Sequence, residues 1–221
     1  MARGYETLMS GLELADRSRP LKKLLITSTQ PAEGKTTVTI NLAVTMGLAG
    51  RRVLIIDADL RKPRIHTLLG LENARGFADI LAGAVEAEDV IELEQAVYFD
   101  AEAVDNKQPV RVITSGPASP AAFKALGSAR LAAALTSLTT VYDVVLLDSP
   151  PVLSVNDALL LAPLVDGVLL VMNAGRVVEK DLTRARDWLQ RTRAQLLGVA
   201  MNRFEEALHG PGLHPYRSYY E

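Results

Sequence analysis

The sequence predicts an α/β fold, namely a doubly wound, mostly parallel sheet with helices on both faces. Runs rich in Val, Ile and Leu recur along the chain and are typical of strands buried on both faces. Most of them alternate with stretches of helical spacing, which favours a parallel sheet joined by right-handed crossovers. Strands are expected at 24–27, 53–56, 110–114, 144–147, 168–172 and 197–201, and helices at 36–48, 120–138, 156–164 and 179–194.

The stretch 70–108 is less regular, and there a short helix is expected at 77–81 and an extra strand near 97–99. An N-terminal arm or helix takes up residues 1–20, and one central domain spans 21–205. The segment 206–221 contains Gly and Pro without apolar periodicity, so the sequence predicts a flexible tail.

Composition narrows the classes of function. The chain has 221 residues, 48% of them hydrophobic, which suits one well-filled domain. The formal net charge of −2 gives no general attraction to polyanions, so no nucleic-acid partner is expected. The sequence contains no cysteine, which excludes disulfides and thiolate chemistry. The N-terminus lacks the apolar core of a secretory signal, and we expect a cytoplasmic protein.

A phosphate-binding loop follows the first predicted strand and leads straight into a helix. Glycine lets the backbone N–H groups approach a phosphate, and the helix N-terminus adds partial positive charge. Lysine is expected to bridge the β- and γ-phosphates, and the threonine hydroxyl after it to bind Mg²⁺. The strict Walker A pattern requires Gly where Thr29 stands. The candidate nucleotide ligands are Glu33, Gly34, Lys35, Thr36 and Thr37.

Carboxylates follow two of the other predicted strands. Asp57 and Asp59 come after 53–56, and strand alternation places both on one face, about 6 to 7 Å apart. Asp148 follows 144–147, which is the apolar strand and acid of a Walker B element. Acids at the carboxyl ends of parallel strands, beside a phosphate loop, favour a nucleotide site over simple turn capping.

A dinucleotide-binding site is the alternative that the position of Asp57 raises, about 20 residues beyond the loop. The loop itself argues against that site. It carries Gly-Lys-Thr-Thr at 34–37, and no G-x-G-x-x-G pattern follows the first strand. The sequence therefore favours ATP with Mg²⁺.

Three segments carry a resemblance to a known family: the phosphate loop, VLIIDADLR at 53–61 and VVLLDSPPV at 144–152. Through them the sequence resembles the bacterial tyrosine kinases that control capsule and exopolysaccharide synthesis. These kinases are a branch of the deviant-Walker P-loop NTPases, and the resemblance covers residues 21–204. It implies an ATP-dependent protein-tyrosine kinase with Lys35 as a catalytic residue. It also implies that Asp57 is the base toward a tyrosine hydroxyl, and that Thr36, Asp59 and Asp148 surround the metal.

The resemblance extends to both ends of the chain. Asn202 and Arg203 match the position where relatives contact adenine, although a turn that ends the sheet explains them equally well. Kinases of this family use a tyrosine-rich tail as their own substrate in trans, which implies that Tyr216, Tyr219 and Tyr220 are the phosphoacceptors.

The resemblance also implies a homo-oligomer, and a membrane polysaccharide co-polymerase that activates the chain and recruits it to the inner face of the plasma membrane. The family usually begins with Glu-x-x-Arg-x-x-Arg on a helix that packs against the next subunit. The matching positions here are Arg3, Glu6 and Met9, so the motif for ring assembly is altered.

A non-kinase ATPase switch that acts through ATP-dependent self-association is the alternative function. Cell-division and chromosome-partitioning ATPases of the superfamily carry a signature lysine early in the loop. Gln30 stands at that position here, which favours the kinase. The basic residues Arg61, Lys62 and Arg64 are candidates for contact with an acidic partner or a phosphate, with a solvated turn as the simpler interpretation.

Overall fold

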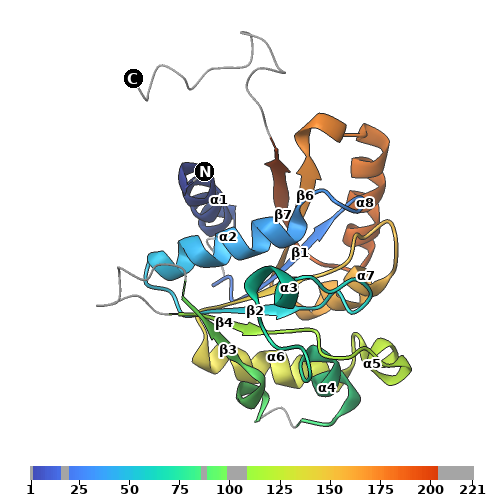
Figure 1. Ribbon diagram of the computed structural model, residues 1–221. Helices are drawn as coiled ribbons and strands as arrows, with labels where there is room; N and C mark the ends of the chain where they lie inside the picture. Colours follow the sequence, from blue (N-terminus) through green and yellow to red (C-terminus); the bar gives the residue numbers. More distant parts are fainter. Residues whose placement is uncertain (1, 16–19, 86–88, 99–108, 204–221) are drawn as a thin grey trace.

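The computed structural model describes residues 2–15, 20–85, 89–98 and 109–203 (Figure 1). Seven strands and eight α-helices lie in these ranges, with three short 3₁₀ helices labelled η. In chain order the elements are α1 Ala2–Ala15, β1 Lys23–Ser28, α2 Lys35–Leu48, β2 Val53–Asp57, α3 Ile65–Leu69, α4 Phe77–Ala82, η1 Val90–Leu93, β3 Gln95–Val97, β4 Val110–Ile113, α5 Pro120–Ala125, α6 Ala129–Val141, β5 Val144–Asp148, α7 Asp157–Leu161, η2 Ala162–Leu164, β6 Gly167–Asn173, η3 Ala174–Arg176, α8 Glu179–Arg191 and β7 Leu196–Asn202.

The strands form one sheet in the order β3-β4-β2-β5-β1-β6-β7. Every neighbouring pair is parallel except β3 and β4, which are antiparallel. Parallel strands need crossover connections, and the helices between them supply these. The expected doubly wound, mostly parallel sheet is confirmed.

Two hydrophobic clusters, one on each face of the sheet, form the core. On one face α1, α2 and the start of α3 cover the sheet, with Leu42 of α2 and Ile65 of α3 fully buried. On the other face α4 to α8 cover it, and Phe77 is the largest side chain that is fully buried there. Strands β2 and β5 are buried along their whole length, because helices lie on both sides of them (Figure 1).

The expected helix at 120–138 is wrong, because the structure has two helices there. Helix α5 ends at Ala125, and Gly127 then takes a φ of 79°, a conformation that L side chains rarely adopt. Ser128 begins α6 by accepting a hydrogen bond from the N–H of Leu131 on its side chain. The Gly-Ser pair therefore interrupts an apolar pattern that runs on without a break.

The helix expected at 156–164 is also shorter than the pattern suggests. Helix α7 ends at Leu161, and the chain continues as the 3₁₀ helix η2 with Pro163 near its start. Proline lacks the N–H that an α-helix interior needs, which explains the change.

The irregular stretch contains both predicted elements. The short helix at 77–81 is confirmed as α4. The extra strand exists as β3, but it lies at 95–97 instead of 97–99 and runs antiparallel at the sheet edge. The tail at 206–221 lies outside the described residues.

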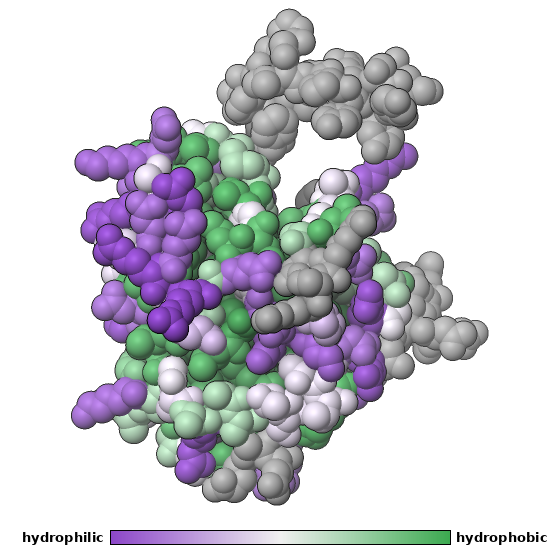
Figure 2. Space-filling model, turned by 180° about the vertical axis from the view of Figure 1, so that it is seen from behind, coloured by the Kyte–Doolittle hydropathy of each residue, from purple (hydrophilic) through white to green (hydrophobic). Residues whose placement is uncertain are grey.

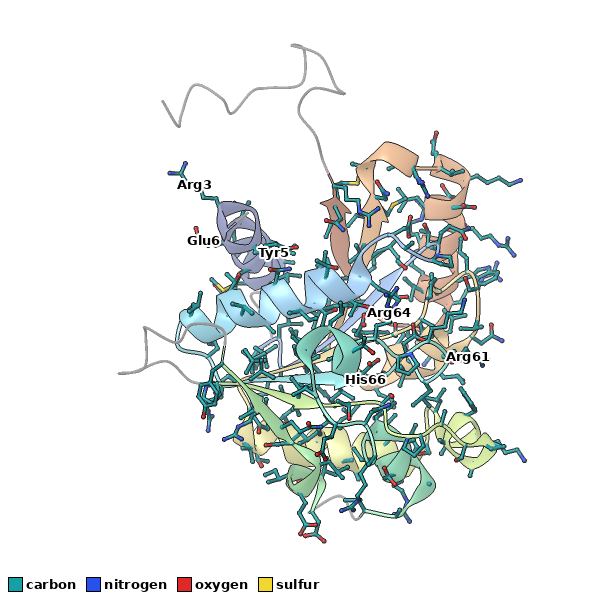
Figure 3. The ribbon with its side chains drawn as sticks, in the orientation of Figure 1. Arg3, Tyr5, Glu6, Arg61, Arg64 and His66 are labelled. Atoms are coloured by element: carbon teal, nitrogen blue, oxygen red, sulfur yellow. The ribbon has the colours of Figure 1, made fainter. Side chains whose placement is uncertain are left out.

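Helix α1 packs along α2, with Leu12 buried between them. Tyr5 turns toward α2, where it hydrogen-bonds Asn41, whereas Arg3 and Glu6 lie on the other side of the helix (Figure 3). Helix α8 carries a strongly charged surface on the opposite side of the molecule. Seen from behind in Figure 2, a hydrophilic surface borders a hydrophobic band. The edge strand β7 contacts α8, and its residues Val199 and Met201 are exposed. None of the helices described is long and apolar enough to cross a lipid bilayer.

Candidate functional site

Three neighbouring strands bring the candidate residues to one edge of the sheet. Strand β5 lies between β2 and β1, and all three are parallel, so their carboxyl ends meet. Asp57 at the end of β2 pairs in register with Asp148 at the end of β5. The phosphate loop follows β1 on the other side of β5. Sequence positions more than a hundred residues apart therefore meet at one place.

The phosphate loop is held by contacts within itself. The Glu33 carboxylate accepts hydrogen bonds from the Thr29 hydroxyl at 2.9 Å and from the Gln30 N–H at 2.8 Å. The hydroxyl at position 29, where the strict motif has glycine, thus serves to close the loop. Gly34 has a φ of 92° and precedes the first residue of α2 without a side-chain cap, so N–H groups at the helix start stay free for a phosphate.

The ammonium group of Lys35 forms ion pairs with carboxylates of the site. Its ammonium is 3.0 Å from Asp59 Oδ2 and 3.9 Å from Asp148 Oδ1. Burial alone would lower the pKa of Lys35, but the charges of Asp148 and Asp59 outweigh burial and raise it. The lysine therefore stays charged across the physiological range, and it is well placed to bind an anion between the loop and the acids.

Asp148 is buried against the start of α2. The Thr36 hydroxyl donates to Asp148 Oδ2 at 2.7 Å, and the Thr39 hydroxyl lies 3.5 Å from Oδ1. Burial raises the pKa of Asp148 to about 6, although Lys35 and the Thr36 hydrogen bond act in the opposite direction. The carboxylate is thus held in a low-dielectric position without full compensation of its charge.

Asp57 is fully buried, and its carboxylate accepts three backbone hydrogen bonds. Its Oδ2 accepts the N–H groups of Arg64 and Ile65 at the start of α3, at 3.2 and 3.0 Å. Its Oδ1 accepts the N–H of Asp59 at 3.3 Å. Burial and the nearby charge of Asp148 raise its pKa to about 7, a value suited to proton transfer near neutral pH.

The expected alternation of Asp57 and Asp59 along a strand does not hold. Strand β2 ends at Asp57, and the chain then turns, with the Asp59 Oδ1 accepting the N–H of Lys62 at 3.0 Å. The two acids consequently have different partners. Asp59 faces Lys35, whereas Asp57 faces the backbone of α3.

The oxygen ligands suit a magnesium–nucleotide complex. No group of three or more His, Cys, Asp or Glu side chains that could hold a metal ion occurs in the described parts of the chain. Magnesium bound with a nucleotide does not need such a group, because one or two carboxylates suffice when phosphate and water fill the remaining positions. Thr36 and Asp148 offer a hydroxyl and a carboxylate in direct contact beside the loop.

Asn202 lies beside the phosphate loop at the end of β7. Its side-chain amide donates to the carbonyl oxygen of Glu33 at 3.0 Å, and its Oδ1 accepts the N–H of Arg203. A Cβ atom at Gly34 would overlap that amide, so the close approach of loop and strand requires glycine. Gln30, at the start of the loop, donates to Asp181 in the first turn of α8 at 3.1 Å.

One interaction of the site was not expected from the sequence. The Arg61 guanidinium binds Asp157 of α7 through two hydrogen bonds, at 2.8 and 3.0 Å, and lies 4.8 Å from the ring centre of Phe123. The loop that follows β2 is thereby tied to the helix that follows β5. Asp157 has no sequence signal of its own, because an acid in the first turn of a helix is common.

These features are typical of a P-loop NTPase: a phosphate loop that leads into a helix, and neighbouring strands that each end in an aspartate. A family model described as ParA, NUBPL iron-transfer P-loop NTPase, matches residues 20–207. The tyrosine-protein kinase YwqD of Bacillus subtilis (strain 168) is 36% identical over 198 residues, which cover 90% of this chain and 79% of that protein.

Solved structures agree with this assignment. The kinase domain of the Escherichia coli tyrosine kinase ETK matches with a TM-score of 0.80 at 28% identity, over 92% of this chain and 77% of that one. The septum site-determining protein MinD of Pyrococcus horikoshii OT3, complexed with Mg-ADP, matches with a TM-score of 0.63 at 28% identity, over 83% of this chain and 70% of that one. The chain belongs to the bacterial tyrosine kinase family of P-loop NTPases. Its tail tyrosines lie outside the described residues.

Proposed function

We propose that this chain is an ATP-dependent protein-tyrosine autokinase of capsular or exopolysaccharide synthesis that phosphorylates its own tail tyrosines in trans. The observation that carries the proposal is the meeting of Asp57, Asp148 and the phosphate loop at three adjacent strand ends. Relatives named tyrosine-protein kinases support it.

In this proposal, different residues bind the phosphates, the adenine and the metal ion. Lys35, with the N–H groups of 33–37, binds the β- and γ-phosphates of ATP, and Asn202 and Arg203 contact the adenine. Thr36, Asp59 and Asp148 hold Mg²⁺, which neutralises phosphate charge when it is bound.

Asp57 acts on the acceptor. It takes the phenolic proton of the tyrosine while the phenolic oxygen forms a bond to the γ-phosphorus. The bond between that phosphorus and the β–γ bridging oxygen breaks, and ADP leaves. The buried position of Asp57, with a pKa near 7, supports this role.

The proposed setting is the inner face of the plasma membrane, where a polysaccharide co-polymerase activates a homo-oligomer of this chain. Oligomerisation presents the tail of one subunit, with Tyr216, Tyr219 and Tyr220, to the site of the next. The altered positions Arg3, Glu6 and Met9 imply that contacts other than the usual N-terminal motif support assembly.

Mixing two variants tests the proposal. Asp57→Asn removes the base, and replacement of Tyr216, Tyr219 and Tyr220 by Phe removes the acceptors, so each variant alone should give no phosphotyrosine. The intact site of the Phe-tailed chain should phosphorylate the tail of the Asp57→Asn chain. Phosphotyrosine is mapped by mass spectrometry with ATP, Mg²⁺ and the cytoplasmic segment of a candidate activator.

The same experiment separates the two functions. If neither the unaltered chain nor the mixture becomes phosphorylated in the presence of activator, the kinase proposal fails. The likeness to MinD then favours an ATPase switch. Such a switch predicts that ATP increases the sedimentation coefficient of the chain without any phosphotyrosine.

A further inference from the structure

Three basic residues, Arg61, Lys62 and Arg64, follow Asp57 and Asp59 along the chain, and they have different surroundings in the structure. Arg61 is bound to Asp157. The side chains of Lys62 and Arg64 are exposed, and neither has a hydrogen-bond or ion-pair partner within the described ranges. Arg61 is directed toward α7, whereas Arg64 lies beside α3 on the side of α2 (Figure 3).

The backbone holds Lys62 and Arg64 next to the candidate catalytic acids. The N–H of Lys62 donates to Asp59 Oδ1 at 3.0 Å, and the N–H of Arg64 donates to Asp57 Oδ2 at 3.2 Å. The main chain of each residue is therefore held against a carboxylate of the site. Because these hydrogen bonds use main-chain groups, the two exposed side chains remain available to bind another group.

The negative charge of the site explains a role for the exposed cations Lys62 and Arg64. The site contains three buried or nearly buried carboxylates and one lysine, which those carboxylates already engage. An acidic substrate that approached the acids alone would be repelled. The exposed cations Lys62 and Arg64 offset this negative charge and can attract an anionic group.

We propose that Lys62 and Arg64 bind an acidic side chain that neighbours the acceptor tyrosine, and so select acidic tyrosine peptides. This inference rests on the proposed kinase function and concerns the substrate side of the same site. It also ranks the tail tyrosines as acceptors, because Tyr220 is followed by the acidic Glu221 whereas Tyr216 is followed by the basic Arg217. Tyr220 is preferred, and Tyr216 is the poorest acceptor.

An anionic membrane is the other class of ligand for exposed cations. Segments that bind acidic lipids carry about four to eight Lys or Arg residues in a cluster. Lys62 and Arg64 are two exposed cations without an ion-pair partner in the described part of the chain, and their main-chain N–H groups bind Asp59 and Asp57. The arrangement therefore fits a peptide better than a lipid surface.

The test uses two peptides that contain residues 212–221 with Tyr220 as the single tyrosine. One keeps Glu221, and the other carries Glu221→Arg. Binding to the full chain is measured by fluorescence anisotropy with a non-hydrolysable ATP analogue and Mg²⁺, and phosphorylation is measured with ATP and activator. Lys62→Glu with Arg64→Glu reverses the charge of these two side chains, and Arg191→Glu, at the far end of α8, is the control for charge reversal away from the site.

The unaltered chain should bind the Glu221 peptide about two- to tenfold more tightly than the Glu221→Arg peptide, the range expected for one or two exposed charge pairs. The double variant should reverse that order, and Arg191→Glu should preserve it. The preference should weaken at 0.5 M salt, since the Debye length then falls to about 4 Å. ATP affinity should not change.

Several results would overturn the inference. The first is that the unaltered chain binds both peptides equally. A double variant that weakens ATP and both peptides alike would assign the cations to the nucleotide phosphates. Binding to phosphatidylserine vesicles that depends on the two cations, without a peptide preference, would assign them to a membrane.

The inference and the kinase function can fail separately. A chain that binds the acidic peptide preferentially but phosphorylates neither peptide retains the recognition and loses the proposed function. A chain that phosphorylates both peptides with equal kcat/KM retains the function and loses the recognition.

Discussion

Asp57→Asn should make the protein more stable at pH 8 in the absence of nucleotide and magnesium, although it removes the proposed base. Asp57 is fully buried, and its pKa is raised from 3.8 to about 7. A carboxyl group whose pKa is higher in the folded chain binds more protons when folded, here between about pH 4 and pH 7. Its contribution to stability is therefore favourable at low pH and declines as the pH rises through that window.

The size of the effect follows from the shift and from the hydrogen bonds. A pKa raised by about 3 units, at about 1.4 kcal/mol per unit, makes the ionised group unfavourable by about 4 kcal/mol at pH 8. Asparagine removes this term but has one acceptor oxygen instead of two. Asp57 accepts three backbone N–H groups, and the loss of one costs about 1–3 kcal/mol. The net gain at pH 8 should be about 2 kcal/mol.

Urea unfolding with EDTA, at pH 8 and at pH 5, measures this gain. At pH 5 the folded-state carboxyl of the unaltered chain is protonated, so the advantage of the variant should vanish or change sign. Asp143→Asn is the control, because the hydrogen bond and charge of Arg52 lower the pKa of Asp143. That control should lose stability equally at pH 8 and at pH 5, because its pKa is lowered from 3.8 and the loss shrinks only below that pH. An Asp57→Asn chain that is no more stable than the unaltered one at pH 8 would refute the reasoning.

Two further variants test the phosphate and metal roles. Lys35→Met should weaken ATP binding by about 10- to 100-fold, because a charge-assisted hydrogen bond contributes about 1.5–3 kcal/mol; unchanged affinity in a calorimetric titration would contradict the loop assignment. Asp148→Asn should shift the Mg²⁺ dependence of ATP binding to higher concentration more than it weakens ATP at saturating Mg²⁺, since a neutral amide is a poorer ligand for a hard cation. A Mg²⁺ titration with the midpoint of the unaltered chain would count against Asp148 as a ligand.

The sheet, and the edge at which the candidate residues meet, were predictable because they rest on local patterns. Apolar runs at 53–56 and 144–147 are long enough to identify buried strands, and parallel strands put their carboxyl ends together wherever the crossovers are right-handed. Asp57, Asp148 and the phosphate loop therefore had to meet at one edge, whatever the details of the loops.

Contacts between distant side chains were not predictable. Nothing in the sequence pairs Arg61 with Asp157, because both stand in segments whose local pattern is an ordinary turn or helix start. The closure of the phosphate loop by Thr29 and Glu33 was hidden for another reason, since the motif calls for glycine at that position. The break at Gly127 depends on one positive φ inside a continuous apolar pattern.

The pKa values of the two acids at the ends of β2 and β5 differ in direction from that of Asp143, which stabilises the fold. An acid that stabilises the folded chain has a partner that lowers its pKa, as Arg52 does for Asp143. Asp57 and Asp148 have raised pKa values although both accept hydrogen bonds, so the folded chain holds their charges at a cost in free energy. Selection for stability alone would replace them with apolar or amide side chains, since buried charges without compensation destabilise a fold. Their presence at two adjacent strand ends, beside the strand that leads into the phosphate loop, is explained if a cation and a proton donor complete the site during the proposed phosphoryl transfer.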